Sequence, residues 1–382
     1  MEAGFYIHIP FCRKKCKYCG FFSGFYPEKN LISKYTDYLC KELKLYKDSG
    51  FLPRTIYLGG GTPSLLSTKD IEKITTFLRK NFCLDYIEFT IEANPEDITM
   101  DLAKCFIDNG INRISLGFQS MNDEVLRFLG RINNSTSNKN SYEILRKAGF
   151  ENISIDFISS IFQDDATETI NQVVSFNAEH YSIYSLSLDE NTLLYREYKK
   201  GNFNPVKDEE YLSDYNKIRS FMINKGYLHY EISNYARNKN YISIHNKGYW
   251  DYLPYIGIGI GAVGFVYESG EDFKGIRFNN VKNFRDYFKL LDEEKFPIAY
   301  KEEIDFKTGI KEFVMLGLRK TQGFSFRKFE GIFKKNFYDC YDFEKIKRLK
   351  LYLKINSFRI ALKTRFFPIM NSVISEIWGA ML

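Results

Sequence analysis

The sequence predicts an α/β fold, in which a parallel sheet is covered by helices and a smaller, mainly helical C-terminal domain follows. Strand-like and helix-like segments alternate over residues 1–235 with a period of about 30 residues, as βα units do. Polar or glycine-rich motifs follow the strand-like segments, and parallel α/β folds bind ligands at the carboxyl ends of their strands. Six such units form either a doubly wound sheet or a barrel, and the periodicity leaves both open.

Six short apolar segments bounded by turn residues are expected to be strands, at Phe5–Ile9, Thr55–Leu58, Tyr86–Glu92, Arg113–Gly117, Asn152–Ile158 and His180–Leu186. Helices are expected between and after them, at Asn30–Lys47, Thr68–Phe82, Thr99–Asn109, Asn122–Leu129, Ser137–Ala148, Ala166–Phe176 and Glu209–Lys225. Thr99 and Asn122 are typical N-caps, and Gly110, Gly149 and Gly226 stand where these helices end.

Three regions are expected along the chain. Residues 1–235 hold the βα units, and residues 236–300 form a less regular connection that contains His245–Trp250 (HNKGYW) and the glycine-rich run Gly257–Gly264. Residues 301–382 form the C-terminal domain, which is helical apart from short strands such as Arg359–Leu362.

The composition is that of a soluble globular protein, with 44% hydrophobic and 27% charged residues. No apolar run approaches the length of a membrane span, and the first residues carry no export signal. The seven cysteines are odd in number, and four of them are scattered, which argues against a disulfide framework and for a reducing compartment. A cytoplasmic location is therefore expected.

The net charge of +6 is unevenly distributed along the chain. Residues 301–382 carry 17 Lys and Arg against 9 Asp and Glu, a surplus of +8, so residues 1–300 sum to −2. A basic domain suits nucleic acid, an anionic membrane surface or an acidic partner, and it can equally be a solvated face. No nucleic-acid-binding signature accompanies the charge, so no nucleic-acid partner is expected.

Three cysteines, Cys12, Cys16 and Cys19, stand close together directly after the first expected strand. Thiolates at this spacing can converge on one soft metal centre. A structural zinc site would need a fourth Cys or His at a similar spacing, and none follows Cys19. His8 precedes the loop, but its apolar surroundings also fit a packed strand residue. An iron–sulfur cubane with three protein ligands would leave one iron open to a reactant.

Candidate ligand-binding residues follow the second, third and fourth strands. Gly59, Gly60 and Gly61 precede Thr62, and glycine lets a backbone approach an anion, although such a run can be only a turn. Glu92 is placed to bind hydroxyls or an ammonium group, or it is a surface charge. Gln119 would supply a neutral donor and acceptor at the same edge.

Arg131 and Asp156 complete this set. Arg131 could pair with a carboxylate, or it is a solvated arginine. Asp156 lies inside the apolar run ISIDFIS, where a buried carboxylate needs a partner, and the ribose hydroxyls of a nucleoside would serve. His245, with Tyr249 and Trp250 nearby, offers an axial nitrogen and flat apolar faces to a porphyrin, or it is a histidine packed among aromatic core residues.

The cysteine spacing resembles that of the radical S-adenosylmethionine (SAM) superfamily, and the ordered motifs resemble its coproporphyrinogen-oxidase-like branch: YIHIPFC, YLGGGTPSLL, IEANPEDIT, ISLGFQSMNDEVLRFLGR, HYSIYSLSL, YEISNYA and HNKGYW. The resemblance covers nearly the whole chain and implies a six-unit partial barrel. It implies that Cys12, Cys16 and Cys19 hold a 4Fe–4S cluster. It further implies a set of SAM contacts: Tyr6, Tyr18, Gly60, Gly61, Thr62, Glu92, Gln119, Arg131 and Asp156.

Within this branch the sequence is most similar to the HemW-type haem chaperones. Phe21 stands where the oxygen-independent coproporphyrinogen III oxidases have a further cysteine, and the first strand begins at Phe5 without the long N-terminal arm of those enzymes. HNKGYW matches the HNxxYW motif that is linked to haem in the chaperones, which implies that His245 contacts haem. The oxidase stays the alternative, so whether the protein is an enzyme is left open.

The resemblance also implies partners. Haem would be passed to a haem-accepting respiratory enzyme, and the chaperone family is compatible with a homodimer. The basic C-terminal domain is hypothesised to dock on such an acceptor at the membrane surface. Two segments depart from the branch: Ser160-Ile161-Phe162 replaces a common Gly-Leu-Pro turn, and Gly261-Ala262-Val263 replaces a common Gly-Ala-His run.

Overall fold

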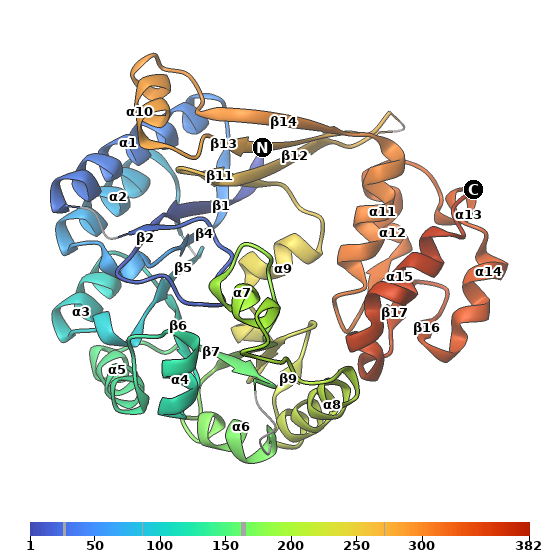
Figure 1. Ribbon diagram of the computed structural model, residues 1–382. Helices are drawn as coiled ribbons and strands as arrows, with labels where there is room; N and C mark the ends of the chain where they lie inside the picture. The colour runs from blue at the N-terminus through green and yellow to red at the C-terminus, as the bar shows by residue number, and fades with distance from the viewer. Residues whose placement is uncertain (26–27, 86, 162–165, 271) are drawn as a thin grey trace.

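The computed structural model describes residues 1–25, 28–85, 87–161, 166–270 and 272–382. Within these residues, twelve strands form one strongly curved sheet in the order β14-β13-β12-β11-β1-β4-β5-β6-β7-β8-β10-β9 (Figure 1). The row has two free edges, β14 and β9, so the sheet is an open, partial barrel. Residue 86, where the third strand was expected to begin, and Phe162 of the departing turn lie outside the described residues.

Six neighbouring strands are parallel and correspond to the six predicted ones: β1 (Glu2–Ile9), β4 (Leu52–Gly60), β5 (Glu88–Ala93), β6 (Arg113–Gln119), β7 (Ile153–Ser159) and β8 (His180–Ser185). All seven residues of β6 are buried, as expected of a parallel strand that is covered on both faces. The α/β fold class and its partial barrel are thereby confirmed.

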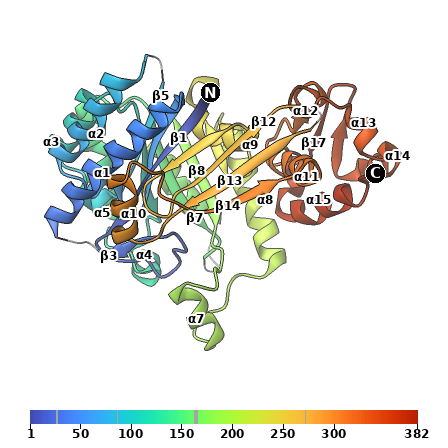
Figure 2. The same ribbon diagram turned by 90° about the horizontal axis from the view of Figure 1, so that it is seen from above.

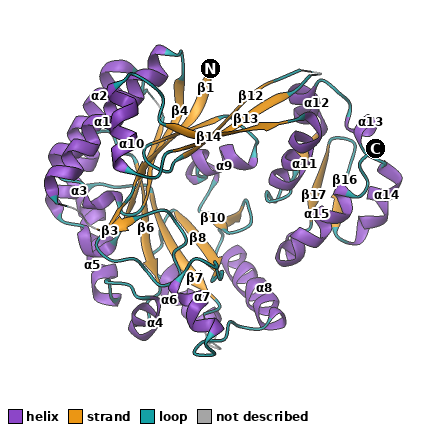
Figure 3. Ribbon diagram, turned by 45° about the horizontal axis from the view of Figure 1, so that its top comes forward, coloured by secondary structure: helices purple, strands orange, loops and turns teal. Residues whose placement is uncertain are grey.

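Helices follow these strands and lie on the outer, convex side of the sheet (Figures 1 and 3). They are α1 (Lys29–Asp48), α2 (Thr68–Asn81), α3 (Met100–Asp108), α4 (Asp123–Leu129), α5 (Ser135–Ala148), α6 (Ala166–Val174) and α8 (Asp208–Asn224), and the short 3₁₀ turns η1 (Pro63–Leu65) and η2 (Pro95–Asp97) precede α2 and α3. Helix α7 (Leu193–Lys199) lies instead beside the cysteine loop, where the Leu194 amide donates to the Lys17 carbonyl at 2.8 Å. The expected N-caps are present, since the Thr99 and Asn122 side chains accept from the first-turn amides of α3 and α4. Helix α7, which projects from the sheet in Figure 2, was not anticipated.

The region expected to be a less regular connection extends the main sheet instead. Strand β11 (Tyr255–Ile258) pairs in parallel with β1, and the antiparallel strands that continue from it are β12 (Val263–Glu268), β13 (Lys274–Asn280) and β14 (Ile298–Ile304). At the other edge, β10 (Asn234–Ala236) and β9 (Leu228–His229) are antiparallel additions to β8. Helix α10 (Phe284–Asp292) packs on α1, and η3 (Lys239–Tyr241) precedes α9.

Helix α9 (Ile244–Trp250), which carries the HNKGYW motif, lies on the inner, concave side of the sheet (Figure 3). The Glu88 carboxylate at the start of β5 accepts from the backbone amides of Ile244 and His245, at 2.7 and 2.9 Å. A carboxylate at a helix N-terminus is favourable, because it satisfies amides that have no partner within the helix. Helix α9 is therefore fixed at the amino-terminal end of the parallel strands.

The C-terminal domain has its own aromatic core and lies beside the sheet, connected through the long strands β12–β14 (Figure 2). Its elements are α11 (Phe306–Gly317), β15 (Phe324–Ser325), α12 (Phe326–Phe333), α13 (Phe337–Cys340), α14 (Phe343–Arg348), η4 (Leu349–Leu351), β16 (Leu353–Ile355), β17 (Arg359–Leu362), η5 (Thr364–Ile369) and α15 (Met370–Trp378). The predicted strand Arg359–Leu362 is the centre of a small β15-β17-β16 sheet. Among the described residues no helix combines the length and apolarity that a bilayer crossing requires.

The buried carboxylate of Glu42 connects helix α1 to the segment after β11, to β13 and to α10. Glu42 accepts from the Gly259 amide at 2.8 Å, the Tyr287 hydroxyl at 2.6 Å and the Asn280 amide group at 2.7 Å. Burial raises the pKa of Glu42 to about 7, although these three donors act against the rise. The native state therefore holds a proton on Glu42 that the unfolded chain releases near pH 4.5.

Exchange of Glu42 for Gln is expected to remove part of the pH dependence of stability. A raised carboxyl pKa gives stability that is present below pH 4.5 and is lost as the pH rises through about 7. The wild-type free energy of unfolding should fall between pH 5 and 8 by up to about 3 kcal/mol more than that of Glu42→Gln. Urea unfolding at several pH values measures this. Glu143→Gln, on an exposed helix face, is the control, and equal slopes for wild type and Glu42→Gln would refute the role of Glu42.

Candidate functional site

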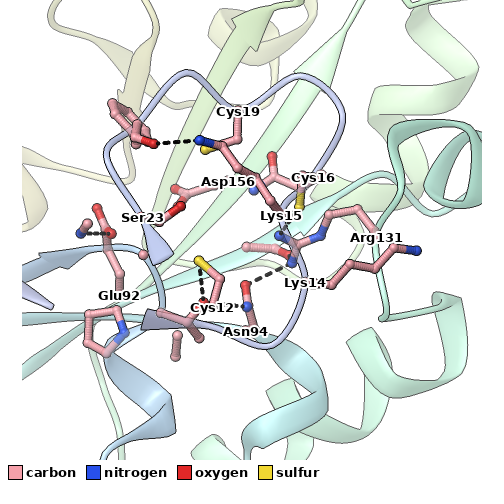
Figure 4. Close-up of a pocket in the computed structure, with 18 of the residues that line it drawn as sticks. Cys12, Lys14, Lys15, Cys16, Cys19, Ser23, Glu92, Asn94, Arg131 and Asp156 are labelled. Atoms are coloured by element: carbon pink, nitrogen blue, oxygen red, sulfur yellow. Dashed lines mark hydrogen bonds between the residues drawn. The ribbon is translucent and has the colours of Figure 1, made fainter. Parts of the chain in front are cut away.

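One cavity opens at the carboxyl ends of the parallel strands, beneath the cysteine loop (Figure 4). The volume of this cavity is about 150 Å³. It is lined by loop and strand-end residues that sequence analysis singled out: Cys12, Cys16, Tyr18, Cys19, Gly60, Gly61, Thr62, Glu92, Gln119, Arg131 and Asp156. Segments far apart in the sequence are therefore brought together as their position at strand ends predicts.

The cysteine loop leaves the sheet through the parallel pair β2 (Phe11–Cys12) and β3 (Gly24–Phe25). The Cys12 sulfur accepts from the Thr62 hydroxyl at 3.6 Å, and the Cys16 sulfur accepts from Arg131 Nη1 at 3.7 Å. The backbone of the loop turns back on itself, because the Cys19 amide donates to the Cys16 carbonyl at 3.3 Å. Two of the three sulfurs thus have a hydrogen-bond donor within the cavity.

The three thiols share a cavity but are not gathered for a single ion. Within the described residues there is no group of three Cys, His, Asp or Glu side chains that could hold one metal ion. A tetrahedral zinc ion is bound by all of its ligands at once, whereas in a 4Fe–4S cluster each cysteine binds a different iron. The arrangement therefore fits the cluster better than the zinc knuckle. Burial, with Cys16 and Cys12 adding to it, raises the pKa of Cys19, which a bound cation would oppose.

Arg131 fixes the geometry around the loop. Its guanidinium donates to the Asn94 side-chain oxygen and to the Gly117 carbonyl, both at 2.9 Å, and to Asn133 Oδ1 at 2.8 Å. With the contact to Cys16, it joins the ends of β5 and β6 to the cysteine loop (Figure 4). The solvated alternative for Arg131 is therefore wrong.

The Arg131 guanidinium stays positively charged in this environment. Burial would lower the pKa of the guanidinium, but Tyr18, Cys16 and Glu96 around it raise that pKa above its ordinary value. The pKa of the Tyr18 hydroxyl is raised by its own burial, so it stays a neutral donor beside the thiols. A permanent cation thus faces the sulfurs that a cluster would use.

Glu92 is buried at the end of β5 and is not a surface charge. Its carboxylate accepts from the Tyr57 hydroxyl at 2.8 Å and from the Gly60 amide at 3.0 Å. Burial raises the pKa of Glu92 to about 7, with Asp156 adding to the rise and the two donors opposing it. A cationic group that bound here would restore the carboxylate at neutral pH.

The glycine run is required by close packing. Gly60 has a φ of 114°, and a Cβ there would come within 2.5 Å of the His8 ring. A Cβ on Gly61 would approach the Phe11 carbonyl oxygen to 2.5 Å. The bare backbone lets the cysteine loop lie directly on the end of β4, with Thr62 facing the cavity.

Asp156 and Gln119 reach the cavity from β7 and β6. Asp156 accepts from the Ser115 hydroxyl at 3.0 and 2.8 Å, and burial raises its pKa. Gln119 adopts a positive φ of 64° at a shift in the β6–β7 register, and its side-chain oxygen accepts from the Tyr184 hydroxyl at 2.6 Å. Ser115 and Tyr184 also line the cavity, as does Asn94.

These three residues were missed by sequence analysis. Ser115 lies four positions before Gln119 on the same strand face, and Asn94 lies two positions after Glu92, so the two-residue period of strands could have found both. Tyr184 lies in the HYSIYSLSL motif, but nothing in that motif ranks it above the neighbouring tyrosine.

Tyr6 does not line the cavity. Its hydroxyl is 3.0 Å from His8 Nδ1, and His8 Nε2 is 2.9 Å from the Phe22 carbonyl oxygen. Tyr6 is thus linked to the cysteine loop through His8, which is a packed strand residue as its apolar surroundings allowed.

His245 lies at the other end of the strands, away from the cysteines. It is 2% exposed, and both ring nitrogens are engaged: Nδ1 is 2.8 Å from the Thr55 hydroxyl and Nε2 is 2.9 Å from the Tyr249 hydroxyl. Burial lowers its pKa to about 3, with the cations Arg54 and Arg113 adding to the effect. Its ring also stacks on Tyr57 at 4.9 Å, and Tyr57 in turn holds Glu92. The HNKGYW helix and the cavity are therefore connected through the core.

Comparison with known proteins places the chain in a family. Residues 6–172 match the model of the Radical SAM superfamily. The heme chaperone HemW of Lactococcus lactis is 33% identical over 376 residues, which cover 97% of this chain and 96% of that protein. HemW of Bacillus subtilis is 34% identical over 331 residues, 85% of each chain. The solved structure of Escherichia coli coproporphyrinogen III oxidase (HemN) superposes with a TM-score of 0.80 at 20% identity, over 98% of this chain and 89% of that one.

The fold is that of the solved coproporphyrinogen III oxidase, and residues 6–172 match the radical SAM superfamily. Within that superfamily it belongs to the HemW family.

Exchange of Arg131 for Met is expected to destabilise the protein by about 3 kcal/mol, because it leaves several buried acceptors without their cationic donor. The matched control is Arg127→Met on the neighbouring helix α4, where the side chain is 71% exposed and a change within about 0.5 kcal/mol is expected. Chemical denaturation of the cluster-free protein measures both. Equal stability of the two variants would show that Arg131 does not fix the cysteine loop.

Proposed function

We propose that this protein is a haem chaperone of the HemW type. It holds a 4Fe–4S cluster and SAM in the strand-end cavity, binds haem at the HNKGYW helix, and delivers haem to respiratory haem proteins. One observation carries the proposal: in a chain of the HemW family, the three cysteines and the polar strand-end residues of the SAM set line one cavity.

Each residue in the cavity has a part that its chemistry suits. Cys12, Cys16 and Cys19 would ligate three irons of the cluster, and the fourth iron would stay open to SAM. Glu92 would pair with the SAM ammonium group and Asp156 with the ribose hydroxyls. When bound, the cluster and SAM supply one-electron chemistry, while the protein orients them and excludes water.

Four other residues of the SAM set line the same cavity and would complete the binding site. Gly60, Gly61 and Thr62 bring bare backbone and one hydroxyl to its wall, and Gln119 adds an amide group. Arg131 would hold the Cys16 side of the cluster. Tyr6 would act indirectly, through His8 and the cysteine loop, because its hydroxyl is already engaged there.

Haem would bind where helix α9 meets helix α11. An aromatic cavity of about 170 Å³ lies there, lined by residues that include Tyr249, Tyr252, Tyr255, Phe265 and Met315. Flat aromatic faces favour a porphyrin. Tyr249 both lines this cavity and holds His245 Nε2, so movement of Tyr249 would release that nitrogen for the haem iron.

A titration with haem tests the chaperone function, with the reconstituted protein kept anaerobic and binding followed by absorbance. We expect stoichiometric binding to wild type and binding at least about tenfold weaker to His245→Ala, because an axial nitrogen is lost. Tyr249→Phe is expected to tighten binding, since it frees His245 Nε2 without removing the ring. His229→Gln, at another buried histidine, is the control.

Two results would refute this account. Unchanged haem affinity in His245→Ala would show that His245 is only a core residue. Absence of specific haem binding, together with decarboxylation of coproporphyrinogen III in the presence of SAM and a reductant, would favour the alternative function, an oxygen-independent coproporphyrinogen III oxidase. The residues of the SAM set that line the cavity are the observation that keeps this alternative.

The basic residues of the C-terminal domain would dock the chaperone on a membrane that carries its acceptor. Residues 345–366 contain eight Lys and Arg and no Asp or Glu: Lys345, Lys347, Arg348, Lys350, Lys354, Arg359, Lys363 and Arg365. Two large apolar side chains of the same segment are exposed, Leu351 at 57% and Phe358 at 73%. Cations with exposed apolar residues between them match an anionic bilayer surface.

Binding to vesicles that contain phosphatidylserine is expected to fall steeply as salt rises from 50 to 300 mM. The triple exchange Lys350→Gln, Lys354→Gln, Arg365→Gln should weaken it by about 1 kcal/mol per charge. A triple exchange of Lys139, Lys147 and Lys199 to Gln, on the surface of the main domain, is the control. Sedimentation with vesicles measures binding. Binding that does not change with salt concentration would refute the proposed membrane docking of the C-terminal domain.

A further inference from the structure

A continuous row of polar side chains runs through the concave interior of the sheet, from the cavity to helix α9. It begins at Asp156, which accepts from the Ser154 hydroxyl at 3.3 Å. Ser154 is also 2.8 Å from His180 Nδ1, and His180 Nε2 is 2.7 Å from the Tyr230 hydroxyl. Ser154 and His180 are fully buried. The proposed function gives a role to Asp156 but none to Ser154, His180 or Tyr230.

The row continues to the N-terminus of α9. The Tyr230 hydroxyl accepts from the Ser243 amide at 3.4 Å, and the Ser243 hydroxyl donates to Glu88 at 3.3 Å. Glu88 is the carboxylate that caps α9, as described above. A change at Asp156 therefore has a path of hydrogen bonds to the helix that carries His245.

Ser154 stands between two competing acceptors. A hydroxyl has one proton, so Ser154 donates either to Asp156 or to His180 Nδ1, but not to both. If Nδ1 carries a proton, it donates to Ser154, and Ser154 then donates to Asp156. If Nδ1 is bare, Ser154 donates to it, and Asp156 is left to accept from another donor. The tautomer of His180 thus decides where the Ser154 proton points.

His180 can exist in either tautomer because its ring is neutral. Burial holds its pKa well below the ordinary value, and the Arg113 guanidinium adds to this effect. Arg113 Nη2 lies 3.4 Å from His180 Nδ1 and can donate only, so it favours the bare form of that nitrogen. Tyr230 can accept from or donate to Nε2 and therefore tolerates both tautomers.

We propose that His180 is a positioning residue for the nucleoside of SAM. When a ribose hydroxyl donates to Asp156, Ser154 turns its proton to His180 Nδ1, and the single ring proton moves by exchange with water from Nδ1 to Nε2, where Tyr230 accepts it. The inference rests on the proposed function, since it requires SAM in the cavity. No atom is gained or lost: one ligand hydroxyl replaces Ser154 as donor to Asp156.

The tautomer can be observed directly with S-adenosylhomocysteine, which has the same nucleoside as SAM. The chain has four histidines, so ¹⁵N-histidine labelling gives few signals, and the spectrum of His180→Gln identifies those of His180. In the anaerobically reconstituted protein, addition of this ligand is expected to increase the Nε2–H form of His180. In Ser154→Ala the ligand should still bind, but the His180 signals should no longer respond to it.

Affinity gives a second, independent readout. Tyr230→Phe removes the acceptor for the Nε2 proton and keeps the ring, so it should weaken S-adenosylhomocysteine by about fivefold or more. Tyr227→Phe is the matched control, because that buried hydroxyl donates to the Ala178 carbonyl, outside the row. In a Ser154→Ala background, Tyr230→Phe should cost nothing further, because the connection to Asp156 is already cut. Calorimetric titration measures the wild type, the three single variants and the Ser154→Ala/Tyr230→Phe double variant.

The outcomes separate this inference from the function on which it rests. If the wild type does not bind S-adenosylhomocysteine, the SAM site fails and the inference fails with it. If the ligand binds but the His180 tautomer is unchanged, only the inference is overturned. An equal loss from Tyr230→Phe with and without Ser154 would also overturn it, since that result would reflect packing alone.

Discussion

The buried guanidinium of Arg131 is the contact on which the cavity depends. Parallel strands bring their carboxyl ends to one edge, but the cysteine loop must still be held over that edge. Arg131 does this through the side chain of Asn94, the Gly117 carbonyl and the Cys16 sulfur. A buried cation is costly unless it is fully paired, and here its acceptors are the strand ends themselves. The same guanidinium that orders the loop also lies against the Cys16 sulfur, at 3.7 Å.

Much of the fold could be predicted from the sequence because the βα units are regular and their caps are local signals. All six parallel strands and the helices between them lie within a few residues of their expected positions. The cavity followed from the same logic, since Glu92, Gln119 and Asp156 stand at or near strand ends and all three line it. Their position on the parallel strands was the informative signal, because the residue type alone left Glu92 open to a second interpretation, as a surface charge.

The rest could not be predicted because it depends on contacts between distant segments. The region from residue 236 to 300 has short strands with weak patterns, and their place beside β1 is fixed by pairing that no local signal reveals. His245 was interpreted from its motif as a haem contact, with a packed core histidine as the alternative. In the structure Thr55, Tyr57 and Glu88 enclose it from strands far away in sequence. Its hydrogen bonds place the HNKGYW motif and the cysteines at opposite ends of the parallel strands.

The central claim is that Cys12, Cys16 and Cys19 hold a cluster with one iron open to SAM. Electron paramagnetic resonance of the reconstituted, reduced protein tests it most directly, with and without SAM, alongside iron and acid-labile sulfide analysis. The account predicts a 4Fe–4S signal that changes shape on addition of SAM and is lost in Cys16→Ala but kept in Cys83→Ala, at an exposed cysteine. Zinc without labile sulfide, or a cluster signal that is indifferent to SAM, would contradict it.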